Sequence, residues 1–510
     1  MCRYYSWDDE FECSEAYRNV GVIVKNAAIL MGSQAATWAV SLVTFFLVPR
    51  YLGSAQFGHL AFAGAFVSFF GLLAGLGGGQ FMVKEVARDP SRLGSYVVNA
   101  LMMNALLVEV LSLAAIVSAS LLGYPTQTVL LVAIASMGLL LGTLNGILVS
   151  ALQGQQRMGL ATLWSTITIY ASSLGTIWVV TSHKGLIAVA LVGLPFSLIP
   201  LVANGLRLRR QLLQGGAYLD LRLWRVLARG GAPFLVWGAV LTIYGSIDTP
   251  LLSFLAGDVT VAWYAIAYKL ISVPAFLAPL VMTALFPALS VHGTGTGDFP
   301  RFARLTNQAL RMVAFLTVPM AGGLILVAPD VIRLLHYSND FRHAIPLIQI
   351  LAVHVPVVGI DTILGAALIA CDRQRQWVIV GCIAAVLNPL VNLAAIPYTL
   401  HAFGNGAIGA AVVTVATEVL MMGGALYLRP RGIFDLSIVG FVLRCVLACG
   451  VMLAIIALGG VVWLPAKVAL GIAIYAIASL ALRTVSVRDI YQRTGQILAS
   501  ARLRSASSVS

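Results

Sequence analysis

The composition of this chain of 510 residues, 60% of them apolar and only 10% charged, gives a mean hydropathy of +0.93. A soluble domain carries about 25% charged residues to cover its surface, so water is excluded as the main solvent. The formal net charge is +13. We attribute it to Lys and Arg on the inner loops of a membrane protein and expect no nucleic-acid binding.

The N-terminal segment 1–26 is acidic and has no apolar core, so it is interpreted as a cytoplasmic tail and not as a signal peptide. Apolar stretches long enough to span a bilayer, about twenty residues each, then follow one another along the chain. They are longer than membrane strands and lack the alternating pattern of such strands, which predicts an all-α polytopic protein. The fourteen predicted spans are 27–49, 57–81, 97–122, 128–152, 160–182, 186–206, 231–256, 261–289, 311–328, 344–370, 376–399, 406–428, 438–459 and 462–482.

The positive charges predict an orientation. If the N-terminus is placed inside, 25 of the 32 Lys and Arg residues fall on the inner side and five on the outer side. Inner loops carry an excess of Lys and Arg. Both termini, including the basic tail 483–510, are therefore predicted to be cytoplasmic.

The longest internal connection, the Arg-rich cytoplasmic linker 207–230, divides the spans into groups. An N-terminal six-helix bundle, 27–206, precedes it, and a C-terminal six-helix bundle, 231–428, follows. Two additional transmembrane helices, 438–482, lie outside this pattern. Two bundles of equal size suggest the internal repeat found in many transporters.

Three weak matches support such a pseudo-repeat. Residues 52–63 align with 256–267, where the first two helices of each half are joined. Residues 151–157 align with 367–373 after each fourth helix, and 185–188 align with 406–409 before each sixth helix. Because six is an even number, the two copies are predicted to have the same orientation.

Ionisable residues inside the spans are candidates for function, because a charge at the middle of a bilayer is costly unless it is paired or hydrated. Asp248 and Lys269 flank a short outer turn at similar depth. They either form an ion pair that fixes the hairpin, or Lys269 meets an anionic sugar or phosphate while Asp248 positions it. Glu109, Glu418 and Asp248 are candidates for coupling to an ion, and simple hydrogen bonds between helices are the alternative. The spans also contain His354, Asp361 and Arg444.

Uncharged polar residues are candidates for lining a substrate cavity. Amides suit sugar hydroxyls as well as contacts between helices. The six cysteines form no C-x-x-C pattern, and no glycine-rich loop ends in Lys-Ser or Lys-Thr, so we predict no metal centre and no cofactor. The amide candidates are Gln34, Asn145 and the pair Asn388 and Asn392, which share one helix face.

Several motifs, in order and spacing, resemble one known family. They are Pro49-Arg50-Tyr51-Leu52-Gly53, Lys84-Glu85-Val86-Ala87-Arg88-Asp89, Phe286-Pro287-Ala288-Leu289-Ser290 and Asn388-Pro389-Leu390-Val391-Asn392. Together they are similar to the Wzx-like polysaccharide flippases of the multidrug/oligosaccharidyl-lipid/polysaccharide superfamily. The resemblance covers about residues 27–430.

The resemblance implies a carrier, not an enzyme, in the bacterial inner membrane. Such a carrier would flip undecaprenyl-pyrophosphate-linked oligosaccharide repeat units by alternating access, for O-antigen or exopolysaccharide synthesis. It also implies membrane lipids, H⁺ or Na⁺, and polysaccharide polymerase machinery as partners.

Two alternatives remain open. A cation-coupled multidrug extruder of the same superfamily commonly carries a carboxylate in its first helix, and 27–49 contains none. A membrane polysaccharide polymerase or ligase needs a sizeable outer loop. The longest one here, 329–343, is short but holds two His and two Asp.

Overall fold

The structure is a computed structural model, and it describes residues 7–74, 76, 79–155, 157–214, 219–293, 298–433, 435, 437–460 and 463–484. Side chains 7–36 and those of some further helix positions lie outside the description. Throughout the described ranges the regular structure is helical and no strand occurs. The prediction of an all-α protein is confirmed.

Thirteen helices in the described part are long and apolar enough to cross a membrane. Twelve of them overlap the last twelve predicted spans, and the first, Val40–Leu73, overlaps both 27–49 and 57–81. The first predicted span, 27–49, lies within the N-terminal part of α1, where most side chains fall outside the described residues. The chain is thus a multi-pass membrane protein, and the orientation of its termini stays a prediction.

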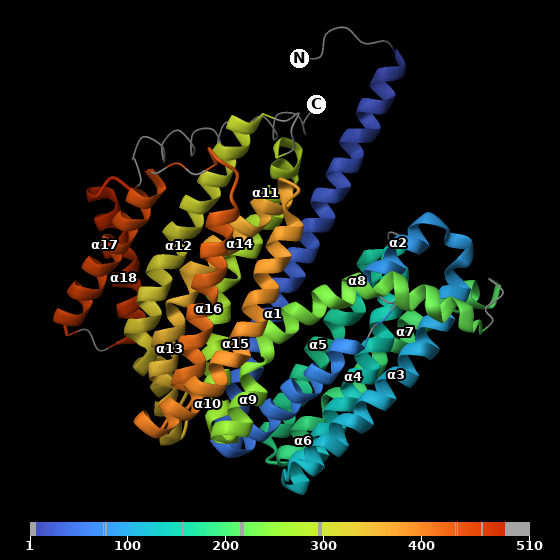
Figure 1. The fold of residues 1–510 in the computed structure, drawn as a ribbon, viewed down its shortest axis with the longest axis horizontal. Coiled ribbons are helices and arrows are strands. Elements are labelled where there is room, and N and C mark those ends of the chain that lie inside the picture. The colour runs from blue at the N-terminus through green and yellow to red at the C-terminus, as the bar shows by residue number, and fades with distance from the viewer. Residues whose placement is uncertain are drawn as a thin grey trace. The chain divides into compact units, whose positions relative to one another are not determined.

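Contacts divide the chain into two compact units, Met1–Pro250 and Leu251–Ser510. In the first unit α3, α4 and α7 pack against one another, and α5 packs on α1 and α7 (Figure 1). Short 3₁₀ turns, Gly71–Leu73 and Pro90–Arg92, flank the short α2. The helices of this unit are α1 (Trp7–Phe70), α2 (Gln80–Arg88), α3 (Leu93–Leu121), α4 (Thr126–Gly154), α5 (Met158–Thr181), α6 (Leu186–Leu191), α7 (Gly193–Gln214) and α8 (Leu221–Ser246).

In the second unit α16 packs along α15 and α14, and α14 packs on α11 and α12. The division at Pro250 falls inside the short α9. A 3₁₀ turn, Asn339–His343, precedes α13. The helices from the division onward are α9 (Asp248–Ala256), α10 (Asp258–Ala275), α11 (Leu277–His292), α12 (Phe299–Leu334), α13 (Ala344–Ala352), α14 (His354–Ala370), α15 (Gln374–Phe403), α16 (Ala407–Leu428), α17 (Ser437–Leu458) and α18 (Leu464–Ala481).

Glycine turns support the predicted repeat. The 64 residues of α1 form two helices that meet at Gly53, where φ is 73° and ψ is 176°. Gly257, which aligns with Gly53, has φ 85° and ψ 162° and separates α9 from α10. This region of conformational space is open essentially only to glycine. Both halves therefore use glycine to turn the chain between their first two helices.

The end of each fourth helix repeats as well. The backbone N–H of Arg157 donates to the carbonyl of Leu152 over 2.9 Å, and that of Arg373 donates to the carbonyl of Leu368 over 2.9 Å. These pairs occupy aligned positions. The third sequence match is not reflected in the backbone, because Gly185 has a φ of 88° whereas Gly406 has a φ of −63°.

The predicted linker 207–230 is largely helical and is fastened to the first unit. The side-chain oxygen of Asn99 on α3 accepts hydrogen bonds from the backbone N–H of Asp220 over 2.9 Å and from Nε1 of Trp224 over 3.0 Å. Gly230 packs so closely on Phe81 of α2 that a side chain there would clash. The division by contacts therefore lies beyond the linker, and the predicted domain boundaries remain a proposal.

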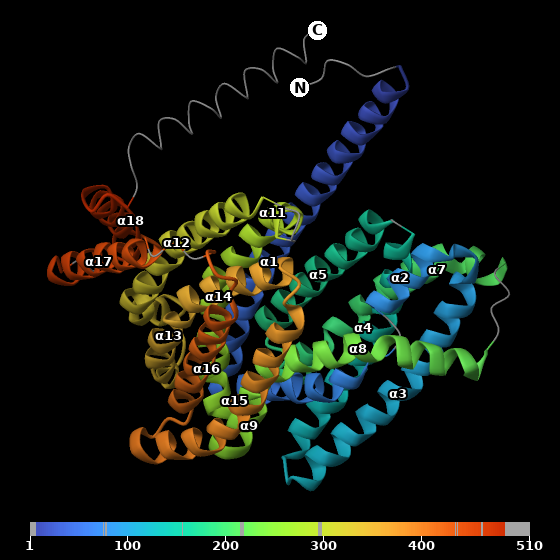
Figure 2. The ribbon, with the colours of Figure 1, turned by 45° about the horizontal axis from the view of Figure 1, so that its top comes forward.

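The last two helices, α17 and α18, pack on α12 of the second unit (Figure 2). The Nζ atom of Lys467 on α18 lies 2.5 Å from Oδ2 of Asp330 on α12, and both side chains are mostly buried. The hydroxyl of Tyr475 donates to the carbonyl of Phe315 over 3.1 Å. An ion pair and a hydrogen bond thus attach the added helices to the six-helix unit.

Candidate functional site

Two helices of the second unit bring buried ionisable groups together. Spacing within each helix selects one face: His354 and Asp361 are seven residues apart on α14, and Thr414 and Glu418 are four apart on α16. Residues so spaced project from one side of a helix. Since α14 and α16 pack against each other, these faces meet inside the unit, and all four side chains are at most 8% exposed.

The side chains of His354 and Glu418, both ionisable, lie close together. Nδ1 of His354 lies 3.9 Å from Oε2 of Glu418, and Glu418 is only 2% exposed. Asp361 is close enough to Glu418 for an electrostatic interaction between their carboxyl groups. Within the described part of the chain, Oδ1 of Asp361 has no hydrogen-bond partner and its carboxyl forms no ion pair. Two buried carboxyl groups and one imidazole therefore lie near one another on α14 and α16.

Amide and hydroxyl groups from α15 and α16 extend this arrangement. Nδ2 of Asn392 donates to Oδ1 of Asn388 over 2.9 Å, and Nδ2 of Asn388 lies 3.5 Å from the hydroxyl of Thr417. Both asparagines are at most 1% exposed. The four-residue spacing of the two asparagines puts their amides in contact, and the pair reaches α16 at Thr417, the residue before Glu418.

A fourth helix, α10, contributes Tyr264. Its hydroxyl lies 3.0 Å from the hydroxyl of Thr414, and both residues are buried. We call the whole set the polar core, and its members are Tyr264, His354, Asp361, Asn388, Asn392, Thr414, Thr417 and Glu418.

The polar core is chemically suited to a small cation. A carboxylate beside an imidazole can take up and release a proton while neighbouring amides and hydroxyls reorient. No group of three or more His, Cys, Asp and Glu among the described residues has the arrangement of a metal site. The core therefore offers one or two exchangeable charges surrounded by neutral hydrogen-bonding groups.

Of the predicted candidates, Asn388 and Asn392 contact each other, and Glu418 is buried on the neighbouring helix α16. Asn145 lies in the first unit instead, where its side-chain oxygen accepts a hydrogen bond from Nδ2 of the buried Asn204 over 3.0 Å. That bond ties α4 to α7. Glu109 is exposed on α3, on a stripe that also exposes Leu106 and Leu113. The two glutamates, both predicted near the middle of a helix, are therefore placed differently.

The remaining candidates stay untested. Asp248 is buried at the start of α9 and belongs to the first unit, whereas Lys269 is half-buried on α10 of the second unit. Their pairing remains a prediction, since the units are described separately. The side chain of Gln34 lies outside the described residues.

Sequence reasoning missed the hydroxyl groups of the core. Thr414, Thr417 and Tyr264 are residues that membrane helices use widely for packing, so their type alone carries little information. Their positions relative to Glu418 are the signal by which they could have been predicted. Thr414 stands one turn before Glu418, and Thr417 lies beside it.

Solved structures of known proteins define the class of this fold. The chain matches the lipid II flippase MurJ in an inward closed conformation with a TM-score of 0.71 at 17% identity, over 89% of this chain and 99% of that one. It matches an inward-facing MATE family multidrug resistance transporter of the MOP superfamily with a TM-score of 0.61 at 15% identity, over 76% of this chain and 93% of that one. The protein therefore has the helical fold shared by flippases and multidrug transporters.

Family models go one step further. The model described as polysaccharide biosynthesis protein matches residues 23–291, more than half of the chain. A second model, MatE, matches residues 233–394. The chain belongs to the polysaccharide biosynthesis protein family within the MOP superfamily, and it is a membrane protein of the flippase and transporter class. The resemblance found in the sequence is confirmed.

Proposed function

We propose that this protein flips lipid-linked oligosaccharide repeat units across the bacterial inner membrane during synthesis of a surface polysaccharide. The observation that carries the proposal is the family match over residues 23–291. The repeated glycine turns at Gly53 and Gly257 fit a carrier made of two similar halves that work by alternating access. The lipid would be an undecaprenyl-pyrophosphate-linked glycan.

The polar core is the proposed coupling site. A carboxyl group that is 2% exposed in a membrane-spanning helix is costly to keep charged, so its charge state and the conformation of the second unit should depend on each other. Glu418 is the proposed carrier of the proton, and His354, 3.9 Å away, is its partner. Asn388 and Asn392 hold the neighbouring hydroxyl of Thr417 in place. Binding of Na⁺ at the same carboxyl is the alternative outcome.

The substrate contacts are proposed on weaker geometry. Lys269 is half-buried on α10, five residues after the buried Tyr264. A lysine ammonium at this depth suits a pyrophosphate or an acidic sugar. Asp248, Asn145 and Gln34 remain candidates for the same role. Glu109 is the weaker candidate for ion coupling, because its side chain is exposed on α3.

The test is genetic and chemical. The gene is deleted, lipid-linked oligosaccharides are labelled metabolically, and their exposure on the outer leaflet is measured with a membrane-impermeant lectin or oxidant. We expect intact intermediates to accumulate on the inner leaflet and surface glycan to be lost. Normal surface glycan in the deletion strain would contradict the proposal.

A second candidate function is a cation-coupled multidrug extruder, and the MatE match over residues 233–394 favours it. This match covers α10, α14 and most of α15 but ends before α16, which carries Glu418. The same deletion strain separates the two functions. If the protein is an extruder, the deletion strain should be hypersensitive to several cationic drugs and its surface glycan should be unchanged. If the protein is a flippase, surface glycan should be lost and drug sensitivity should be unchanged.

A further inference from the structure

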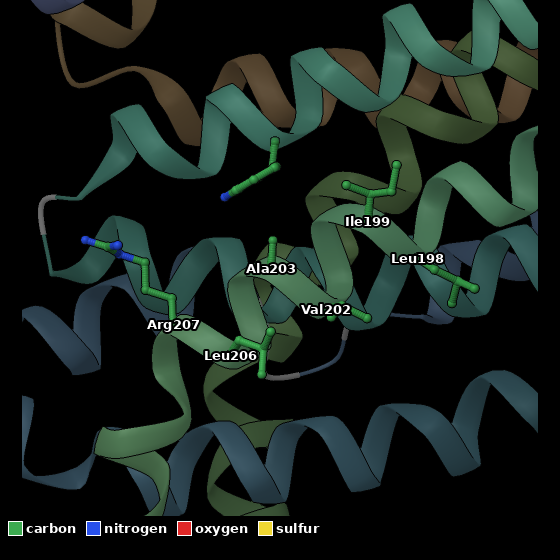
Figure 3. Close-up of a pocket in the computed structure, with 7 residues that line it drawn as sticks. Leu198, Ile199, Val202, Ala203, Leu206 and Arg207 are labelled. Carbon is green, nitrogen blue, oxygen red and sulfur yellow. The ribbon is translucent and has the colours of Figure 1, made fainter.

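A groove in the first unit, between α5 and α7, is not used by the proposed function. Its volume is about 770 Å³. Figure 3 shows that the α7 side chains follow one another along the groove and that Arg207 stands at one end. The lining residues are Trp164 from α5 and Leu198, Ile199, Val202, Ala203, Leu206 and Arg207 from α7.

The groove has an apolar floor with one charged end. Leu198, Val202 and Leu206 are spaced four residues apart and are 46%, 54% and 62% exposed, so they form one continuous stripe. Arg207 is exposed at the C-terminal end of that stripe. An apolar stripe that ends in a guanidinium group has the chemistry to bind an amphiphile with a hydrocarbon chain and an anionic headgroup.

The length of the groove selects among such amphiphiles. Nine residues separate Leu198 from Arg207, which corresponds to roughly 14 Å along a helix. Half of the hydrocarbon core of a bilayer is about 15 Å thick. The groove therefore reaches from a headgroup at the interface to the middle of the bilayer, as the acyl chain of a phospholipid does. A polyprenyl chain long enough to cross the bilayer would exceed it.

The groove is also preformed. The neighbour of Ala203, Asn204, is fully buried on the opposite face of α7 and donates a hydrogen bond to Asn145 on α4 over 3.0 Å. On α5 the hydroxyl of Thr168 lies 3.3 Å from the carbonyl of Phe196 on α7. These two bonds fix α7 against α4 and α5, so the groove does not depend on a ligand to form.

We propose that this groove binds one anionic phospholipid, with an acyl chain along Leu198, Val202 and Leu206 and the phosphate at Arg207. Trp164, whose amphipathic ring suits the membrane interface, closes the side formed by α5. By the predicted orientation the lipid belongs to the cytoplasmic leaflet. The site is independent of the proposed transport function, because none of its residues belongs to the polar core.

The test counts bound lipids. The full-length protein is placed in nanodiscs of equal parts phosphatidylglycerol and phosphatidylethanolamine, extracted into mild detergent and analysed by native mass spectrometry. We expect the wild type to retain one phosphatidylglycerol, and Arg207→Gln to lower that occupancy at least fivefold. Arg207→Lys keeps the charge and should retain most of it. Ala203→Trp, which fills the groove, should lower it to the same extent as Arg207→Gln.

Arg210→Gln is the matched control, since Arg210 is an exposed arginine on the same helix outside the groove. It should retain the lipid as the wild type does. Equal losses in Arg210→Gln and Arg207→Gln would reduce the effect to general surface charge and overturn the proposal. Unchanged retention in both Arg207→Gln and Ala203→Trp would overturn it as well.

A competition decides the identity of the lipid. Undecaprenyl phosphate is added at the same molar amount as phosphatidylglycerol. If the protein retains undecaprenyl phosphate instead, and Arg207→Gln abolishes that retention, the groove is a site for the carrier lipid and the phospholipid proposal is wrong. Correct folding of each variant is checked by its elution volume and helical circular dichroism.

Discussion

Both units bury asparagine, serine and threonine side chains. Among the described residues the first unit buries one carboxyl group as well, Asp248 near its end, whereas the second unit buries Asp330, His354, Asp361 and Glu418. In the first unit the buried amides join backbone or side-chain groups of neighbouring helices. Asn104, for example, donates from Nδ2 to the carbonyl of Leu76 over 2.9 Å. The two halves of a repeated fold have thus acquired different kinds of interior.

The difference has a physical consequence. A hydrogen bond between an amide and a carbonyl does not change with pH or with the ion gradient. A buried carboxyl group changes its charge and therefore the free energy of the conformation that holds it. We infer that the first unit serves as a stable partner and that the second unit carries the state-dependent part of the cycle.

The largest effect is expected from Glu418→Gln, which keeps the shape of the side chain but removes its exchangeable charge. If Glu418 couples transport, surface glycan in cells that depend on this variant should fall to the background of the deletion strain. Glu109→Gln is the matched control, because Glu109 is exposed on α3, and it should support near-normal glycan. Equal activity of both variants would remove the distinction between the units.

The next largest effect is expected from Lys467→Met in the second unit. Asp330 is only 9% exposed and would lose its partner 2.5 Å away. Removing the mostly buried partner of a buried carboxylate costs up to about 3 kcal/mol, because the ion pair that remains is screened by solvent, and thermal unfolding in detergent should detect the loss. Arg333 also pairs with Asp330 but is 72% exposed, so Arg333→Gln should cost less than about 1 kcal/mol. Similar losses for both variants would contradict the buried ion pair.

A third prediction concerns what the two units share. Gly53→Ala and Gly257→Ala each force a side chain into backbone conformations with φ of 73° and 85°. Each should lower stability by about 1–3 kcal/mol, and by similar amounts. Gly64→Ala lies in regular helix with no atom within 4 Å of the added carbon, so it should be neutral or stabilising. A cost confined to one of the two turns would argue against a structural repeat.

The smallest effect is expected for the amide pair of the first unit. A double-mutant cycle of Asn145→Leu and Asn204→Leu measures the hydrogen bond between them, which is 3.0 Å long. Side-chain hydrogen bonds in membrane proteins contribute about 0.6 kcal/mol on average. A coupling energy of that size, unchanged between pH 6 and pH 8, fits a static first unit. A coupling energy that varies with pH would contradict a static first unit.

Hydropathy predicted most of the fold, because the bilayer requires long apolar helices whatever the protein does. The structure contains thirteen helices that overlap the predicted spans. The alignment of 52–63 with 256–267 located the two junctions at which Gly53 and Gly257 turn the chain. The contacts that build the polar core were not predictable in the same way. His354, Asp361, Asn388 and Glu418 come from three helices, and only tertiary packing brings them together.

The contrast between Glu109 and Glu418 shows why. Both stand near the middle of a uniformly apolar helix, so sequence treats them alike. Lipid tails are as apolar as leucine, and a membrane helix therefore carries no strong amphipathic signal for which face packs inward. In the structure Glu109 is exposed, whereas only 2% of Glu418 is exposed. The i, i+4 spacing of Asn388 and Asn392, in contrast, was readable because it is local to one helix.

Transport in reconstituted vesicles tests the central claim most directly. The purified protein is inserted into liposomes that contain a fluorescent undecaprenyl-pyrophosphate-linked oligosaccharide, a pH gradient is imposed, and a membrane-impermeant reagent reports movement of the glycan between leaflets. Gradient-dependent movement is predicted for the wild type and for Glu109→Gln, with Glu418→Gln at the level of empty liposomes. Movement by Glu418→Gln that still follows the gradient would contradict coupling through the second unit.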